Sequence, residues 1–189
     1  MKILVFDNYD SFTYNLVQLI RELAPSAFLE VHRNNEISLE AIKAFDKILL
    51  SPGPGVPSES GLLLPLLKEY ATTKSILGVC LGQQAIAENF GGTLTNLSQV
   101  YHGVATDVHI TMPSSLFEDL PSSFQVGRYH SWVVNEKNLP AELVITSKDD
   151  NGYIMSLEHT KYDVKAVQYH PESVLTPLGP TIIKNWLKS

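Results

Sequence analysis

The stretch Gly78-Val79-Cys80-Leu81-Gly82 decides how the rest of the chain is interpreted. Apolar residues come directly before the cysteine, and a helix-like run, Gln83–Phe90, follows it. A glycine lies two residues on either side of Cys80, which is the G-x-nucleophile-x-G pattern of a sharp strand-to-helix turn. Glycine permits the close packing that such a turn requires. The stretch therefore predicts a thiol raised from the end of a strand, with backbone N–H groups directed at whatever the sulfur attacks.

A lone cysteine is more often a small buried apolar residue than a nucleophile, so the turn alone does not decide the matter. Cys80 is the only cysteine in the chain, which excludes an intrachain disulfide and most thiolate metal sites. A free thiol is typical of the reducing cytosol. The two flanking glycines favour the nucleophile.

Outward from this stretch, the first half of the chain alternates strand-like and helix-like runs. Ile3–Phe6, Ile48–Leu50 and Ser75–Val79 are mostly apolar without alternation, which is typical of strands buried on both faces of a parallel sheet. Phe28–Val31 predicts a further strand. Strand and helix in alternation imply right-handed crossovers and a parallel sheet. We expect the helices at Phe12–Leu23, Leu39–Ala44 and Gly61–Tyr70.

The starts of these helices carry their own signals. Asp10 or Ser11 could cap the first helix, and Ser38 could cap the second. Pro65 predicts an irregularity in the third.

Three loops are expected at one edge of the sheet, because the carboxyl ends of parallel strands meet there and form sites in folds of this kind. The loops are Asp7–Ser11, Ser51–Gly55 and the turn at Cys80. The proline–glycine loop is either a rigid turn and nothing more, or a place where the backbone presents a donor.

The composition changes after Gly92. Short alternating runs from Thr93 to Gln168 predict strands, several of them antiparallel, and Pro180–Lys188 predicts a final helix. The expected fold class is α/β, with an open, mostly parallel central sheet flanked by helices and extra antiparallel strands in the C-terminal half. We expect one domain over residues 1–189.

The charge balance limits the possible partners. Lys and Arg number 14 and Asp and Glu number 20, giving a net charge of −6. An acidic chain argues against nucleic acid as a partner, and no basic run suggests a membrane surface. No stretch approaches the roughly 20 apolar residues that span a bilayer. We expect a cytoplasmic protein that binds neither.

A catalytic thiol usually needs a base, and the chain offers 6 histidines. His170 precedes Pro171 and Glu172, and residues i and i+2 of an extended chain share a face. Proline favours that conformation at His170. Glu172 could therefore orient the imidazole while its other nitrogen meets the sulfur. His32 and His109 have no acidic neighbour expected to orient them, and nothing near His130 in sequence fixes its tautomer.

Three motifs together resemble the triad-type, class I glutamine amidotransferases, and they occur in that family's order over nearly the whole chain. The N-terminal stretch Asp7–Asn15 is similar to the small glutaminase subunit of anthranilate synthase and of aminodeoxychorismate synthase. The motifs are Pro52-Gly53-Pro54-Gly55, Gly78–Gln84 and His170-Pro171-Glu172-Ser173.

The resemblance implies a catalytic triad. Cys80 would be the nucleophile, His170 the acid–base group and Glu172 the carboxylate that orients it. It implies no metal or other cofactor.

The resemblance also implies a set of substrate-binding residues. The N–H groups of Leu81 and Gly55, the latter in the loop with Gly53 and Pro54, would form an oxyanion hole. Gln84 would help to hold glutamine. The backbone of Ser131 and Trp132 would pair with the amino-acid end of the substrate.

The expected function is hydrolysis of L-glutamine to L-glutamate and ammonia, which passes to a larger chorismate-using subunit in a hetero-oligomer. The product would be anthranilate or 4-amino-4-deoxychorismate, in tryptophan or folate biosynthesis. Two alternatives stay open, a stand-alone thiol hydrolase resembling γ-glutamyl peptidases and a non-catalytic regulatory subunit. Val104 stands where relatives often carry lysine, which leaves the subgroup open.

Overall fold

A computed structural model describes all residues, 1–189. Its centre is a nine-stranded sheet in the order β2-β1-β3-β4-β11-β10-β9-β6-β7. From β2 to β11 neighbouring strands pair in parallel, and from β11 to β7 they pair antiparallel. This arrangement confirms the predicted fold class. The strands are β1 (Lys2–Asp7), β2 (Phe28–Arg33), β3 (Lys47–Leu50), β4 (Ser75–Val79), β6 (Val104–Ile110), β7 (Ser123–Arg128), β9 (Leu143–Asp149), β10 (Ile154–His159) and β11 (Val164–Val167).

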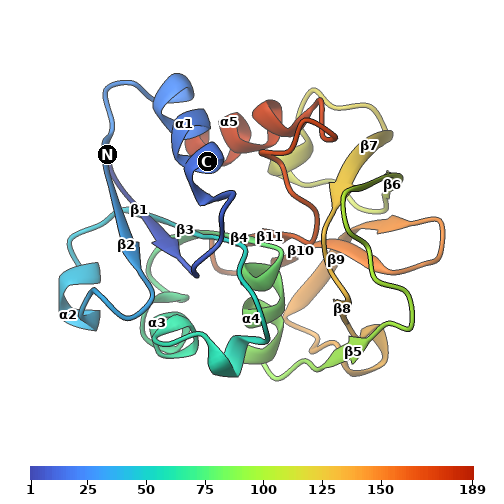
Figure 1. The fold of residues 1–189 in the computed structure, drawn as a ribbon, viewed down its shortest axis with the longest axis horizontal. Helices are drawn as coiled ribbons and strands as arrows, with labels where there is room; N and C mark the ends of the chain where they lie inside the picture. The colour runs from blue at the N-terminus through green and yellow to red at the C-terminus, as the bar shows by residue number, and fades with distance from the viewer.

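Helices cover both faces of the parallel half (Figure 1). On one face lie α1 (Thr13–Leu23) and α5 (Gly179–Lys188); on the other lie α2 (Leu39–Ile42), α3 (Leu63–Tyr70) and α4 (Leu81–Asn89). Successive residues of β1 enter the two cores in turn, since Ile3 and Val5 pack with α1 and α5 whereas Leu4 and Phe6 pack with the other three helices. Both faces are thus apolar, which is why such strands lack alternation in sequence.

Several local predictions differ from the structure. The third helix begins at Leu63 rather than Gly61, and Pro65 fits within its first turn, where N–H groups have no helical partner. No side chain caps α1; instead Asp10 Oδ1 accepts from the N–H of Phe12 at 2.6 Å, two residues further on. Ser38 caps α2 as predicted, accepting from the N–H of Ala41 at 3.2 Å.

A second, two-stranded sheet is built from two segments that were not identified as strands from the sequence. It pairs β5 (Leu94–Asn96) with β8 (Trp132–Val134). Each strand has three residues, which is too short to show a period. The remaining elements are short 3-10 helices at Pro57–Glu59, Ser115–Phe117 and Glu136–Asn138. No helix combines the length and apolar character needed to cross a membrane.

The sheet order places the candidate residues next to one another. β4 lies between β3 and β11, and all three run parallel. β3 leads into the Ser51–Gly55 loop, β4 into Cys80 and β11 toward His170. Three segments distant in sequence therefore meet at one sheet edge.

Candidate active site

The turn at Cys80 has the tight geometry that its glycines predict. Cys80 has φ 54° and ψ −101°, a strained conformation for a residue with a side chain. A Cβ added to Gly78 would lie 2.6 Å from the carbonyl carbon of Gly82, and one added to Gly82 would lie 2.8 Å from the oxygen of Leu50. Only glycine lets α4 pack this closely on β3 and β4. The turn holds a buried thiol at the start of a helix.

His170 and Glu172 form the expected pair. His170 Nδ1 lies 2.7 Å from Glu172 Oε1, and both side chains are almost completely buried. The hydroxyl of Thr176 donates to the carbonyl of His170 at 2.7 Å and accepts from the N–H of Gly127 at 2.9 Å. The segment that carries the imidazole is thereby tied to β7.

The second imidazole nitrogen is available to the sulfur. His170 Nε2 is buried and has no hydrogen-bond partner, although the Cys80 thiol is close enough to affect its titration. Burial opposes the imidazolium charge, but the ionised sulfur of Cys80 and the Glu172 carboxylate outweigh burial and raise the pKa of His170 to about 10. The environment therefore stabilises the protonated imidazole, the form that can donate a proton to a leaving group.

A cavity of about 210 Å³ opens beside Cys80. It is smaller than the roughly 300–1,000 Å³ of drug-sized ligand sites, so it suits a small metabolite. All seven predicted substrate-binding residues line it with the cysteine: Gly53, Pro54, Gly55, Leu81, Gln84, Ser131 and Trp132. Five other residues complete the lining: Val100, Tyr101, His102, Tyr129 and His130.

Two backbone donors at this cavity are free of other partners. Leu81 is the first residue of α4, where an N–H has no helical acceptor. The N–H of Gly55 donates to no protein group, and its positive φ of 72° requires glycine. Both could donate to an oxygen atom bound in the cavity.

The opposite wall rests on a buried polar chain. Arg128 Nη1 donates to Asp149 Oδ2 at 2.6 Å, and Arg128 Nε donates to His130 Nε2 at 3.1 Å. His130 Nδ1 lies 3.0 Å from the carbonyl oxygen of Trp132. Burial and the Arg128 guanidinium lower the pKa of His130 to about 3, so the imidazole is neutral. The expectation that nothing fixes the tautomer of His130 was therefore wrong.

Gln168 contacts the nucleophile, a role that was not predicted from the sequence. Its side chain is fully buried and its Nε2 lies 3.5 Å from Cys80 Sγ. Its Oε1 accepts from Gln84 Nε2 at 3.4 Å. The sequence spacing could have predicted this contact. Gln168 precedes His170 by two residues, and residues two apart in an extended chain point to the same face.

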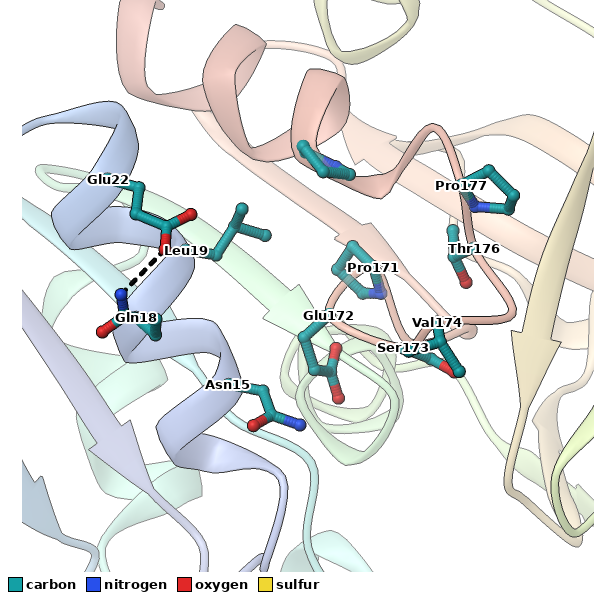
Figure 2. A pocket seen from close by; sticks show the side chains of 11 residues that line it. Asn15, Gln18, Leu19, Glu22, Pro171, Glu172, Ser173, Val174, Thr176 and Pro177 are labelled. Atoms are coloured by element: carbon teal, nitrogen blue, oxygen red, sulfur yellow. Dashed lines mark hydrogen bonds between the residues drawn. The ribbon is translucent and has the colours of Figure 1, made fainter.

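A second pocket, of about 350 Å³, lies on the far side of Glu172 (Figure 2). It is bounded by α1 and the Pro171–Pro180 segment, and Asn15 and Glu172 point toward one another across it. Glu172 Oε2 is buried and has no hydrogen-bond partner. One oxygen of the Glu172 carboxylate thus contacts His170, and the other has no hydrogen-bond partner.

Two histidines set aside in the sequence do have acidic partners. His32 Nε2 lies 2.6 Å from Glu30, and His109 Nε2 lies 2.6 Å from Asp150. The expectation of no acidic neighbour was wrong for both, but neither residue lines the cavity beside Cys80.

Known proteins share this architecture over the whole chain. The model of the family "Glutamine amidotransferase class-I" matches residues 4–189. Anthranilate synthase component 2 of Mycobacterium tuberculosis is 44% identical, covering 99% of this chain and 82% of the relative. The protein of that name from Porphyra purpurea is 41% identical, covering 99% of both.

Solved structures agree. A Thermoplasma acidophilum protein described as part of a GMP synthase superposes with a TM-score of 0.88 at 26% identity, covering 100% of this chain and 92% of that one. A glutamine amidotransferase from Thermotoga maritima gives 0.78 at 13% identity, covering 100% and 96%, and supports the fold alone. With sequence and fold in agreement, the chain belongs to the class I glutamine amidotransferases.

Proposed function

We propose that the chain hydrolyses L-glutamine to L-glutamate and ammonia through a thioester on Cys80. One observation carries the proposal: the thiol and an imidazole with a free, buried Nε2 stand at the ends of adjacent strands, beside a cavity with two free N–H donors. These groups can supply the nucleophile, the proton carrier and the oxyanion donors that formation of a thioester requires.

In the first half-reaction the proton of the Cys80 thiol passes to His170, and the thiolate Sγ attacks the carboxamide carbon of glutamine. The resulting oxyanion accepts from the N–H groups of Leu81 and Gly55; loss of one such donor typically costs about 10²–10³ in rate. An amide nitrogen is a poor leaving group, so His170 must protonate it as ammonia departs.

In the second half-reaction water attacks the thioester. His170, now neutral, takes a proton from the water and returns it to the sulfur as glutamate leaves. Glu172 keeps the imidazole oriented in both halves through its 2.7 Å contact with Nδ1. Glutamine and water are consumed, and glutamate and ammonia are formed.

The proposed acceptor of the ammonia is a larger, chorismate-using subunit. Relatives named anthranilate synthase component 2 support anthranilate as the product, with 4-amino-4-deoxychorismate as the second candidate. Because ammonia is protonated in bulk water, a complex of the two chains is expected, in the cytoplasm. The loop Asn8–Tyr14 lies at the active-site edge and is proposed to be close to the contact.

The test is Cys80→Ser, assayed with and without the large subunit. We expect glutamine hydrolysis to fall by at least about 10³-fold, because the thiolate nucleophile is lost. Ammonia-dependent synthesis by the complex should persist. Undiminished hydrolysis by the folded variant would remove the proposal.

The two alternatives give different outcomes. A γ-glutamyl peptidase would cleave isopeptides without a partner. A non-catalytic subunit would leave Cys80 unmodified by a glutamine analogue carrying an electrophile. Reconstitution with each candidate large subunit, followed by identification of the aromatic product, assigns the pathway.

A further inference from the structure

A continuous hydrogen-bond chain joins a buried ion pair to the sulfur of Cys80. It runs from Asp149 through Arg128, His130 and the carbonyl of Trp132 to Gln84, and from there through Gln168 to the thiol. Gln84 and Gln168 are almost completely buried. The bond between the two amides and the bond to the sulfur are therefore shielded from bulk water.

The direction of each bond is fixed by the far end of the chain. A guanidinium has donors only, so Nε2 of His130 accepts from Arg128 and its Nδ1 carries the proton. That proton goes to the carbonyl of Trp132, which can only accept.

The same reasoning fixes both glutamine side chains. Gln84 Nε2 lies 3.1 Å from the carbonyl oxygen of Trp132, so the NH₂ group of Gln84 is on that side. Its second N–H is directed at Gln168 Oε1, 3.4 Å away. With its oxygen committed to Gln84, Gln168 must present its NH₂ group to Cys80 Sγ. Rotating the Gln168 amide would place two NH₂ groups face to face.

A carboxamide N–H directed at a buried sulfur favours the charged form of that sulfur. Hydrogen bonds to ionised groups are stronger than those to neutral groups, and burial strengthens them further. Cys80 is only 6% exposed, so its thiolate has little solvation from water.

We propose that Gln168 is a catalytic residue that donates to the Cys80 thiolate, oriented for this task by Gln84 and the Arg128–His130 chain. His170 and Gln168, two residues apart, then serve the same sulfur: one exchanges its proton and the other stabilises its charge. The proposal deepens the glutaminase function and rests on it for the catalytic part.

The test compares Gln168→Met with the wild-type protein. Methionine keeps the length of the side chain and removes the donor. Losing a hydrogen bond to a charged group should raise the pH of half-maximal alkylation by iodoacetamide by about one to two units. For glutamine hydrolysis, kcat should fall roughly tenfold or more while KM changes less than about threefold, since the lost contact is to the nucleophile.

Gln83→Met is the matched control. Gln83 is an equally buried glutamine in the same helix as Gln84, but its Nε2 lies 3.5 Å from the carbonyl oxygen of Ile154 and not at the sulfur. Its alkylation profile should match that of the wild type. An unchanged profile in folded Gln168→Met, or the same shift in both variants, would overturn the proposal.

A measurement on the unaltered protein covers the case in which Gln168→Met does not fold. The assigned side-chain amide signal of Gln168 in ¹⁵N NMR should titrate with the same midpoint as alkylation, and the titration should vanish in Cys80→Ser. A signal that does not titrate would contradict the proposed bond. Alkylation needs no glutamine, so failure of the glutaminase assignment would appear as absent hydrolysis in a wild type whose thiol is still reactive.

Discussion

Arg128 is fully buried, and Asp149 is its only ionic partner. The guanidinium also lies 3.5 Å from the ring centroid of Tyr101. Removing one member of a buried pair leaves the other charge uncompensated. Asp149→Asn should therefore lower the free energy of unfolding by about 3–5 kcal/mol, measured by urea denaturation.

The exposed pair of His109 and Asp150 provides the control. Asp150 is next to Asp149 in sequence, but its ion pair is exposed to water. Asp150→Asn should therefore lower the free energy of unfolding by no more than about 1 kcal/mol. Equal losses in the two variants would show that burial of the Arg128 pair has no energetic consequence.

At the residue scale, the sequence predicts contacts between side chains that are close together in the chain. His170 and Glu172 are two apart, so their hydrogen bond follows from extended backbone. The environment of His130 depends on Arg128, which in turn depends on Asp149 from another strand. A contact between distant strands needs the sheet order, which no local pattern contains.

The strand-to-helix turn is the element on which the site depends. Gly78→Ala would place a Cβ 2.7 Å from Ile86 Cδ1 and 2.6 Å from the backbone of Gly82, so α4 must move away from β4. Overpacking of this kind typically costs about 1–3 kcal/mol. We expect that loss in urea denaturation, and a fall of at least about tenfold in glutamine hydrolysis because Cys80 moves with the helix.

Gly91→Ala is the companion variant. Its Cβ would meet nothing within 4 Å, so only the positive φ of 96° opposes it. It should lose about 1 kcal/mol of stability and keep its hydrolytic rate. If Gly91→Ala lost as much of its rate of glutamine hydrolysis as Gly78→Ala, the loss would be due to reduced stability and not to a shift of α4.

Helices and strands could be predicted where a single pattern of apolar residues runs through the whole element. The parallel strands are buried on both faces, and the resulting apolar runs identify them. The start of α1 was predicted less well, because the Asp7 carboxylate takes part there by accepting from Thr13 Oγ1 at 2.8 Å. That contact joins the last residue of β1 to the first residue of α1 across a loop of five residues, and a capping pattern does not describe it.

At the scale of the whole molecule, the active-site edge carries exposed apolar side chains. Val174, which lines the Glu172 pocket, is 92% exposed, and Tyr14, next in sequence to the lining residue Asn15, is 67% exposed. Val174 follows Glu172 by two residues, so a partner chain bound there would contact the segment that carries the proposed catalytic residues His170 and Glu172.

Val174→Glu should therefore weaken the proposed complex. We expect glutamine-dependent synthesis at limiting large subunit to fall about tenfold, as for a contact near the centre of an interface. Phe28→Glu is the control, since Phe28 is 55% exposed and begins β2, at the opposite edge of the sheet. Equal effects of both variants would place the partner elsewhere.

The position of β11 has a consequence for the growing polypeptide on the ribosome. β11 is inserted between β4 and β10, and the residues that follow it carry His170 and Glu172 beside a cysteine made much earlier. Strand pairs so distant in sequence form slowly, because a long loop must close first. Until then Cys80 lacks the His170 imidazole as a neighbour. On the proposed mechanism, a chain can therefore hydrolyse glutamine only after β11 has joined the sheet.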